Sequence, residues 1–261
     1  MRAIAFAACF ALAAIAGSGC RDASTPTHEV RVAAASDLKF AFDDLVAAFS
    51  KQHPEITIKP TYGSSGNFYA QLTNKAPFDI FLSADIDYPR KLIDQGLANK
   101  DSEFLYAVGH IVVWIPNDSK LDITKGIEAL LDPAVRKIAI ANPKHAPYGR
   151  AAEAALKNLN VYGQVQDRLV LGENVSQAAQ FVETGAVDAG IIALSLALAP
   201  PLKEKGRYWE ISTDAYPRLE QGGIILSWAQ NKNAAEKLKA FMLETEGNDV
   251  LKKYGFVMPG E

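Results

Sequence analysis

The chain of 261 residues contains little cysteine and no large excess of charge of either sign. Its two cysteines, Cys9 and Cys20, both fall within the first twenty residues, so the rest of the chain has no disulfide and no thiolate metal site. The formal net charge is only −3, and no block of like charge occurs, which argues against nucleic acid as a partner. The glycine and lysine loop that binds nucleotide phosphates is also missing, and we expect no cofactor.

The first residues, "MRAIAFAACFALAAIAGSGC", have the composition of a targeting segment. One early arginine, an Ala-rich apolar run and small residues at its end predict a secretory signal peptide over residues 1–20. The run is too short and too weakly hydrophobic to favour a membrane span. We therefore expect a periplasmic or otherwise extracytoplasmic protein. Cys20 after Gly19 leaves two alternatives open, a lipid anchor on this cysteine or ordinary cleavage nearby.

Beyond a polar stretch, compact apolar runs alternate with segments of helical periodicity. The pairs are "VRVAAAS" with "FAFDDLVAAF", "ITIKPTYG" with "NFYAQL", "FDIFLSAD" with "YPRKLIDQGL", "HIVVWIP" with "IEALL", "KIAIANP" with "GRAAEAALKNL", and "RLVLGEN" with "VSQAAQFVETG". Three further strand candidates and a helical tail follow. This alternation predicts the α/β class, and the number of units favours two lobes, each a mostly parallel sheet flanked by helices.

Four junctions between a strand and a helix share one chemistry. Ser36 lies at an expected N-cap with Asp37 in the first turn, and "YGSSGN" places hydroxyls at a second helix entrance. Pro147 suits the first turn of a third helix, where Tyr148 follows, and Asn174 is the cap of a fourth. Helix starts present unpaired N–H groups with the positive end of the helix dipole behind them, so several together form an anion site. Each junction taken singly is equally explained as an ordinary cap.

These blocks, together with "APFDIFLSAD" and the closing "KKYGF", resemble the periplasmic molybdate-binding proteins of bacterial ABC transporters. The resemblance runs in the same order from about Val30 to about Val257. It implies a type II periplasmic-binding-protein fold, in which two α/β lobes are joined by a hinge of crossing strands. The lobes close over a tetrahedral oxyanion held in the cleft between them.

With this fold we expect a linker over residues 21–29 after the signal peptide. Lobe 1 is expected to take residues 30–109, and lobe 2 residues 110–213. Residues 214–261 then return to lobe 1 and supply its C-terminal helices.

The resemblance also implies which residues bind the oxyanion. Ser36 and Ser65 would give hydroxyl and backbone donors from the first lobe. Tyr148 and Val175 would give backbone N–H groups from the second lobe, and the residue at Asp37 donates its N–H in some members. The metal would thus be bound only inside molybdate, with no direct cation ligand.

Three further residues have weaker claims on the site. Ser64 replaces Ser65 if the loop is shifted by one position. Some members of the family have a ligand-contacting tyrosine where Ala193 stands in this chain. Ser195 is the candidate to compensate for that missing hydroxyl.

A cavity with donors only favours fully ionised oxyanions such as molybdate, tungstate or sulfate. Phosphate carries a proton near neutral pH and benefits from an acceptor, but the Asp37 side chain is expected to point to solvent. We therefore expect a monomeric receptor that delivers molybdate, and tungstate with it, to the membrane permease of an ABC importer. A binding protein for sulfate or phosphate stays open as the alternative.

Two other classes of site fit the sequence poorly. A catalytic Ser64 or Ser65 needs a base, yet the chain lacks a G-x-S-x-G elbow, and we expect His145 to be exposed beside Pro147. The four histidines are scattered and none has metal-ligand spacing. Asp85 and Asp87 follow a strand as a cap and a solvated side chain would, so we expect neither an enzyme nor a cation site.

Overall fold

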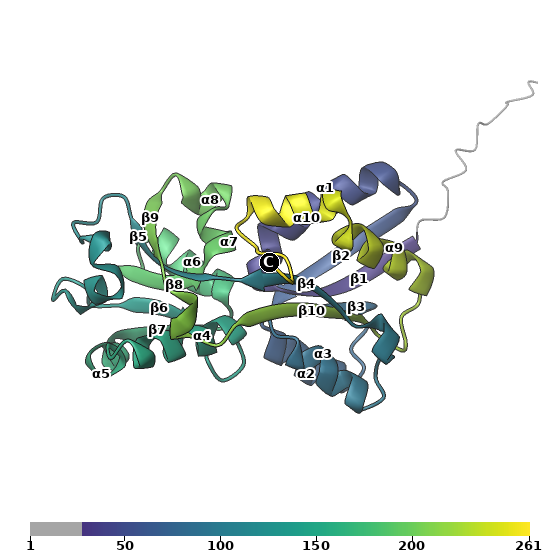
Figure 1. The fold of residues 1–261 in the computed structure, drawn as a ribbon, viewed down its shortest axis with the longest axis horizontal. Helices are drawn as coiled ribbons and strands as arrows, with labels where there is room; N and C mark the ends of the chain where they lie inside the picture. The colour runs from purple at the N-terminus through teal and green to yellow at the C-terminus, as the bar shows by residue number, and fades with distance from the viewer. Residues whose placement is uncertain (1–27) are drawn as a thin grey trace, which may run out of the picture.

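The computed structural model describes residues 28–261, which form two α/β lobes side by side (Figure 1). The expected signal peptide, most of the expected linker and Cys20 lie outside the described residues. The first sheet has the order β2-β1-β3-β10-β4 and the second β7-β6-β8-β5-β9. The first sheet consists of β1 (His28–Ala35), β2 (Ile56–Gly63), β3 (Ile80–Ser83), β4 (Phe104–Gly109) and β10 (Leu219–Ile225). The second consists of β5 (Ile111–Pro116), β6 (Ile138–Ala141), β7 (Leu169–Gly172), β8 (Ala189–Ala193) and β9 (Gly206–Glu210).

One strand in each sheet runs against the other four. In the first sheet β1 is parallel to β2 and β3, whereas β10 is antiparallel to both of its neighbours, β3 and β4. In the second sheet β6 is parallel to β7 and β8, whereas β5 is antiparallel to both β8 and β9. Both sheets are therefore mostly parallel, as the sequence predicts. In each lobe the antiparallel strand is the first strand along the chain after it crosses over from the other lobe.

The crossing from the first lobe to the second is almost straight. Strand β4 ends at Gly109 and β5 begins at Ile111, so the single residue His110 separates a strand of one sheet from a strand of the other (Figure 1). The sequence does not predict β4 as a strand of its own. The apolar run that contains β4 and β5 is interrupted only by Gly109 and His110, and the chain makes no turn at either residue.

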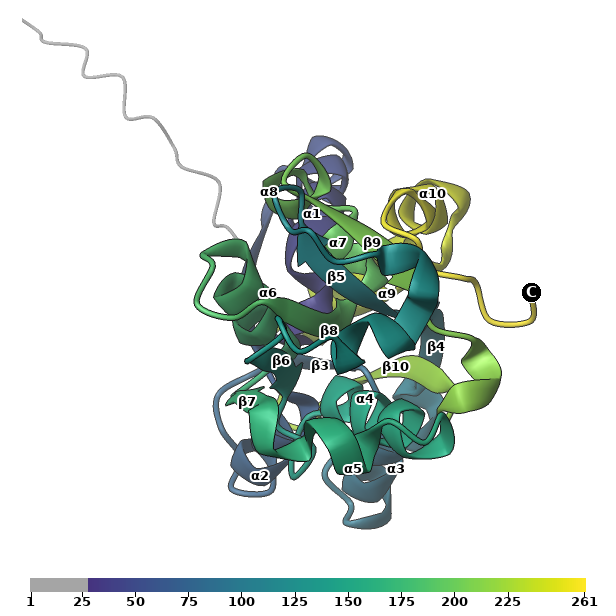
Figure 2. The same ribbon diagram turned by 90° about the vertical axis from the view of Figure 1, so that its left-hand side faces the viewer.

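Helices cover both faces of each sheet (Figures 1 and 2). Those of the first lobe are α1 (Lys39–Gln52), α9 (Lys232–Leu243) and α10 (Thr245–Lys253) on one face, and α2 (Ser65–Leu72) and α3 (Asp87–Asp94) on the other. Those of the second lobe are α4 (Pro147–Asn158), α5 (Tyr162–Val165), α6 (Val175–Glu183), α7 (Leu194–Ala197) and α8 (Pro200–Lys203). Short 3₁₀ segments are Ser36–Leu38, Lys100–Ser102, Ile123–Leu131, Gln166–Arg168 and Thr213–Ala215.

Two expected helices differ in detail from the structure. The segment "IEALL" belongs to the 3₁₀ segment Ile123–Leu131, which is interrupted at Gly126, where φ is 63°. The helical tail is two helices, α9 and α10, because the chain is extended at Glu244 with φ −80° and ψ 168°.

The amphipathic pattern of α1 explains its position on the first sheet. Phe42, Leu45 and Phe49 recur at helical spacing and are all fully buried, while Asp43 and Asp44 between them are exposed. Burial of each such side chain is worth roughly 1.5–3 kcal/mol. This packing fixes the start of α1, and with it the turn that holds Ser36 at the end of β1.

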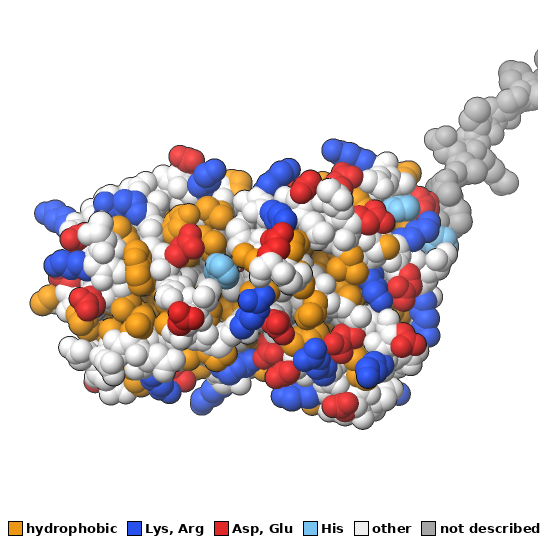
Figure 3. Space-filling model, in the orientation of Figure 1, with side chains coloured by type: hydrophobic (Ala, Val, Ile, Leu, Met, Phe, Trp, Pro, Cys, Tyr) orange, Lys and Arg blue, Asp and Glu red, His pale blue; other side chains and the backbone are white. Residues whose placement is uncertain are grey.

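Basic and acidic side chains are interspersed over both lobes on the face shown in Figure 3. Over residues 28–261, no helix has the length and apolar character needed to cross a bilayer.

Candidate functional site

A small cavity lies between the lobes, where the carboxyl ends of parallel strands from both sheets meet. In open α/β sheets this is the usual position of a ligand. About 180 Å³ of space lies between the lining atoms, part of it open to solvent, so only a small ligand fits. Its lining residues are Ala35, Ser36, Asp37, Gly63, Ser64, Ser65, Ala84, Ala146, Pro147, Tyr148, Asn174 and Val175.

The cavity brings together most of the residues expected at the site. Its lining includes the three first-lobe residues Ser36, Asp37 and Ser65, the second-lobe residues Tyr148 and Val175, and also Ser64. Ala193 and Ser195 are buried nearby but do not line it. The hydroxyl of Ser195 instead donates to the backbone carbonyl of Asp37 at 2.8 Å.

Two serine hydroxyls of the first lobe each accept a hydrogen bond from a backbone N–H. Ala84 N–H donates to Ser65 Oγ at 3.0 Å, and Ser176 N–H donates to Ser36 Oγ at 3.3 Å. A serine hydroxyl has one proton to donate besides its lone pairs. Because the backbone occupies an acceptor site on each oxygen, the hydroxyl protons of Ser36 and Ser65 are left to donate to a ligand in the cavity.

Three helices begin at the cavity. Pro147 occupies the first turn of α4, and the Asn174 side chain caps α6 by accepting from Gln177 N–H at 3.0 Å, as the sequence predicts. Ser64 caps α2 by accepting from Asn67 N–H at 3.4 Å. The first turn of each helix has N–H groups without partners inside the helix, and the positive end of the helix dipole lies there. Ser65, Tyr148 and Val175 fall in these turns.

Ser36 differs from the expected helix cap. It begins the 3₁₀ turn Ser36–Leu38, whose N-cap is Ala35, and its side chain caps no helix of its own. The hydroxyl is bonded instead to the start of α6 in the other lobe, through Ser176 N–H. Ser36 thus contacts both the cavity and the opposite lobe.

Asp37 is the only charged residue that lines the cavity in the described part of the chain, and its side chain is not in solvent as expected. It is 1% exposed, and its Oδ2 accepts from Gln221 Nε2 at 2.7 Å and from Tyr148 Oη at 3.1 Å. Its Oδ1 is buried without a hydrogen-bond partner. Asp37 lies in the 3₁₀ turn Ser36–Leu38, and all three residues of that turn are buried.

Burial raises the pKa of Asp37 to about 6, against the opposing effect of the hydrogen bonds from Gln221 and Tyr148. Burial also raises the pKa of Tyr148 well above its usual value, and the carboxylate of Asp37 adds to this. Gln221 also contacts Tyr106, since its Oε1 lies 3.0 Å from the Tyr106 hydroxyl. The floor of the cavity is therefore a buried polar network that includes side chains of both lobes.

His145 is half buried rather than exposed as expected, with its Nδ1 3.0 Å from Ser64 Oγ. A serine beside a histidine is the first requirement for a nucleophile and its base. Such a base is normally oriented by a third group, yet Ser64 is the only side chain hydrogen-bonded to the His145 ring among residues 28–261. The Ser64 hydroxyl also caps α2, so this pair is explained by contact between the lobes.

The lobes are joined by several polar contacts around the cavity, an arrangement that we call the closed form. The Arg150 guanidinium pairs with the Asp85 carboxylate and donates to Tyr88 Oη at 3.1 Å. Asn67 Nδ2 donates to Glu173 Oε1 at 3.2 Å. Together with the contacts of Ser36 and Asp37 described above, these bonds surround the cavity.

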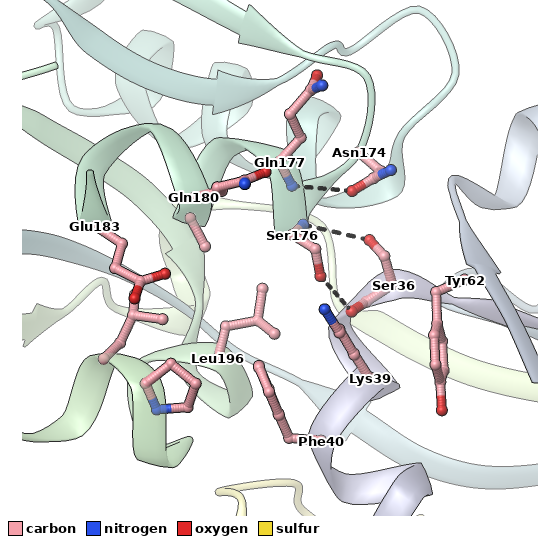
Figure 4. Close-up of a pocket in the computed structure, with 13 residues that line it drawn as sticks. Ser36, Lys39, Phe40, Tyr62, Asn174, Ser176, Gln177, Gln180, Glu183 and Leu196 are labelled. Carbon is pink, nitrogen blue, oxygen red and sulfur yellow. Dashed lines mark hydrogen bonds between the residues drawn. The ribbon is translucent and has the colours of Figure 1, made fainter. Parts of the chain in front are cut away.

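A larger groove adjoins the cavity and shares Ser36 and Asn174 with it (Figure 4). It contains about 1360 Å³ of empty space and opens to solvent between α1, α6, α7 and α8. In Figure 4, Ser36 faces Ser176 across this boundary, and Ser176 Oγ donates to the Ser36 carbonyl at 2.7 Å. The two serines thus form the wall between the groove and the cavity.

Within residues 28–261, no group of three or more His, Cys, Asp or Glu side chains is placed to hold a metal ion. The donors at the cavity are instead hydroxyls and N–H groups. Such a set binds an anion by hydrogen bonds.

Sequence reasoning missed the parts of the site that depend on contact between distant segments. Gln221 lies in the apolar strand β10, and a polar side chain in such a strand is a signal of a buried hydrogen bond. Ser176 and His145 carry no such signal, because their partners are 140 and 81 residues away.

Comparison with known proteins agrees with this geometry. A family profile described as bacterial extracellular solute-binding protein matches residues 30–257. The chain belongs to this family. The solute-binding protein is 35% identical over 229 residues to the molybdate-binding protein ModA of Rhodobacter capsulatus, with 88% of each chain covered. It is 34% identical over 242 residues to ModA of Azotobacter vinelandii, covering 92% of this chain and 94% of the relative. The resemblance noted on the sequence is thereby confirmed.

Solved structures show the same fold. The periplasmic molybdate-binding protein of Azotobacter vinelandii superposes on the solute-binding protein with a TM-score of 0.80 at 32% identity, covering 88% of this chain and 99% of that one. A sulfate-binding protein of Mycobacterium tuberculosis has a TM-score of 0.70 at 14% identity, covering 89% and 88% of the two chains. The second likeness concerns the fold alone. The expected two-lobed α/β fold is confirmed.

Proposed function

We propose that this solute-binding protein captures molybdate, and tungstate with it, and delivers the ion to the membrane permease of an ABC importer. The proposal places the protein in the periplasm or elsewhere outside the cytoplasm, as a monomer that binds without catalysis. Lobe 1 comprises residues 30–109 and 214–261, and lobe 2 residues 110–213. The relatives named for molybdate binding support the choice of ion.

The observation that carries the proposal is the convergence of donors from both lobes on one small cavity. Ser36 and Ser65 offer hydroxyl protons, and three helices begin at the cavity wall. The proposed ligand groups are these two hydroxyls together with the backbone N–H groups of Asp37, Tyr148 and Val175. A dianion that leaves water needs its hydration replaced, and oriented donors in a buried site do this with little reorganisation.

The burial of Asp37 bears on the choice among oxyanions. A carboxyl in the cavity floor accepts a hydrogen bond when ionised, which would favour an ion that carries a proton, such as hydrogen phosphate. When protonated it is neutral and tolerates a dianion. Phosphate is therefore one alternative ion, and sulfate, which is a full dianion like molybdate, is the other.

The test is isothermal titration of the ligand-stripped protein with molybdate, tungstate, sulfate and phosphate in turn. We expect one ion per protein, with tight binding of molybdate and tungstate and much weaker binding of the other two. Preference for sulfate or phosphate would reassign the ion. Absence of binding for all four would overturn the proposal.

A further inference from the structure

One interlobe contact involves the backbone of the residue that follows Ser65. Gly66 lies in the first turn of α2, and its N–H donates to the carbonyl oxygen of His145 at 2.9 Å. The same histidine contacts Ser64 through its ring, as described above. The residues on either side of Ser65 are thus both bonded to one residue of the opposite lobe.

Nothing in the backbone conformation of the first lobe requires glycine at position 66. Gly66 is not among the glycines with positive φ in the described residues, and it lies in a helix, where alanine is favoured over glycine. A Cβ at this position would lie 2.5 Å from the His145 carbonyl oxygen and 2.9 Å from His145 Cα. It would also lie 2.9 Å from Tyr88 Oη, the far end of a first-lobe side chain that accepts a hydrogen bond from Arg150 of the other lobe. The space that a Cβ would need is occupied by the backbone of the other lobe.

We infer that Gly66 is a positioning residue for ligand capture, because its bare backbone lets the loop at His145 dock on α2 when the lobes close over the ion. This inference rests on the proposed function of the cavity. The bond from Gly66 N–H to His145 forms only in the closed form, since its partners belong to different lobes. The same docking places the N–H of Tyr148, three residues beyond His145, at the cavity.

Substitutions in a binding site usually lower the stability of the protein and its affinity for the ligand together, and Gly66→Ala should separate these two properties. Gly66→Ala favours α2 as a helix, and within the first lobe it requires only that the Tyr88 hydroxyl shift. The backbone that the new Cβ obstructs belongs to the second lobe. An ion that enters the open form first meets the donors of one lobe, so its association rate is unchanged, whereas dissociation is faster because the closed form is less populated.

The experiment compares wild-type protein with Gly66→Ala and with the matched control Gly163→Ala. Gly163 lies in α5, and apart from its own helix turn no atom of residues 28–261 lies within 4 Å of the Cβ it would gain. Molybdate affinity and rates are measured by titration and stopped-flow fluorescence, compaction on binding by small-angle X-ray scattering, and thermal stability by calorimetry. For Gly66→Ala we expect an unchanged or higher melting temperature of the ligand-free protein. We also expect at least tenfold weaker affinity, all of it in the dissociation rate, and reduced compaction.

A second variant tests whether the backbone or the imidazole matters. His145→Ala keeps the carbonyl that Gly66 binds and removes only the contact with Ser64, so its affinity should fall less than that of Gly66→Ala. Wild-type affinity and compaction in Gly66→Ala would overturn the inference and leave the proposed function standing. If wild-type protein binds none of the four oxyanions, the function and the inference fall together. If it binds sulfate or phosphate instead, the same comparison with that ion decides the inference.

Discussion

At the scale of single residues, the hydroxyl of Ser65 has its direction set by the backbone. Ala84 N–H donates to its oxygen, and the side chain is fully buried at the cavity wall. The neighbouring Ser64 hydroxyl is engaged by the start of α2 and by His145. The loop "GSSG" therefore holds two serines in different settings: Ser65, which we propose as a ligand donor, and Ser64, which caps α2 and contacts the opposite lobe.

The first prediction concerns the Ser65 hydroxyl. Ser65→Ala removes a donor to a charged ligand, which should weaken molybdate binding by about 1.5–3 kcal/mol, or roughly 10- to 150-fold. Titration calorimetry measures the effect. Ser50→Ala, in which the lost hydroxyl bonds only to the Val46 carbonyl in α1, is the matched control and should bind like wild type. Equal affinity in the two variants would remove Ser65 from the site.

Asp37 makes the site sensitive to pH in a defined direction. Its pKa of about 6 is above the value of an unfolded chain, so the protonated carboxyl favours the native state. That contribution is fully present below about pH 3.9 and is lost as the pH rises through about 6. A dianion in the same cavity favours the neutral carboxyl further and raises the pKa again.

The second prediction follows from this linkage. Molybdate affinity should be highest below pH 6 and should fall between pH 6 and 8, by at most about tenfold per pH unit, with uptake of a proton on binding. Calorimetry in two buffers of different ionisation enthalpy measures the proton uptake. Asp37→Asn should bind without this slope. A slope that persists in Asp37→Asn would assign it to another group.

At the scale of elements, the position of Val175 depends on how α6 begins. The Asn174 side chain caps the helix through Gln177 N–H, and Ser176 N–H donates to Ser36 of the other lobe. The N–H groups of Ser176 and Gln177 thus have partners within the protein, and that of Val175 is the one we propose for the ligand.

The third prediction tests this cap. Asn174→Ala should lower the free energy of unfolding by about 1 kcal/mol, which for a protein of this size lowers the melting temperature by about 2–4 °C. It should also weaken molybdate binding, since the first turn of α6 frays. Asn233→Ala, an exposed position in the first turn of α9, is the control. A melting temperature equal to that of the control would contradict the role of the cap.

The sequence predicted elements well where local patterns decide them. The strands and helices that alternate along the chain were anticipated, and Asn174 and Pro147 lie at the helix starts assigned to them. Strand β4 was missed because only His110 separates it from β5, so the two strands read as one apolar run. The burial of Asp37 and the contact of His145 were missed because packing against the other lobe decides them, and no local pattern encodes such packing.

At the scale of the whole molecule, closure of the lobes links ligand binding to stability. The cavity is built from both lobes, so a bound ion stabilises only the arrangement in which they meet. The polar contacts around the cavity hold that arrangement with hydrogen bonds and one ion pair between Arg150 and Asp85. This ion pair is partly exposed and contributes little by itself, so the proposed ion would add to the preference for closure.

The fourth prediction uses this linkage. Molybdate at a hundred times its dissociation constant should add about 2.7 kcal/mol to the stability of the wild-type protein. For a chain of this length the melting temperature should rise by about 5–11 °C. Differential scanning calorimetry with molybdate, and with sulfate at the same concentration as the control, measures the shift. Equal shifts for the two ions would contradict the selectivity.

The place of β10 in the first sheet sets the order in which the two lobes can be completed as the chain becomes available from its N-terminus. Because β10 lies between β3 and β4, strand β4 has no partner strand in its sheet until residues 219–225 are present. The second sheet uses only strands between residues 111 and 210. The lobe that contains β1 can therefore be finished only after the lobe that contains β5, which reverses the usual N-terminal-first order of domain folding. Until β10 arrives, β4 is an unpaired strand edge.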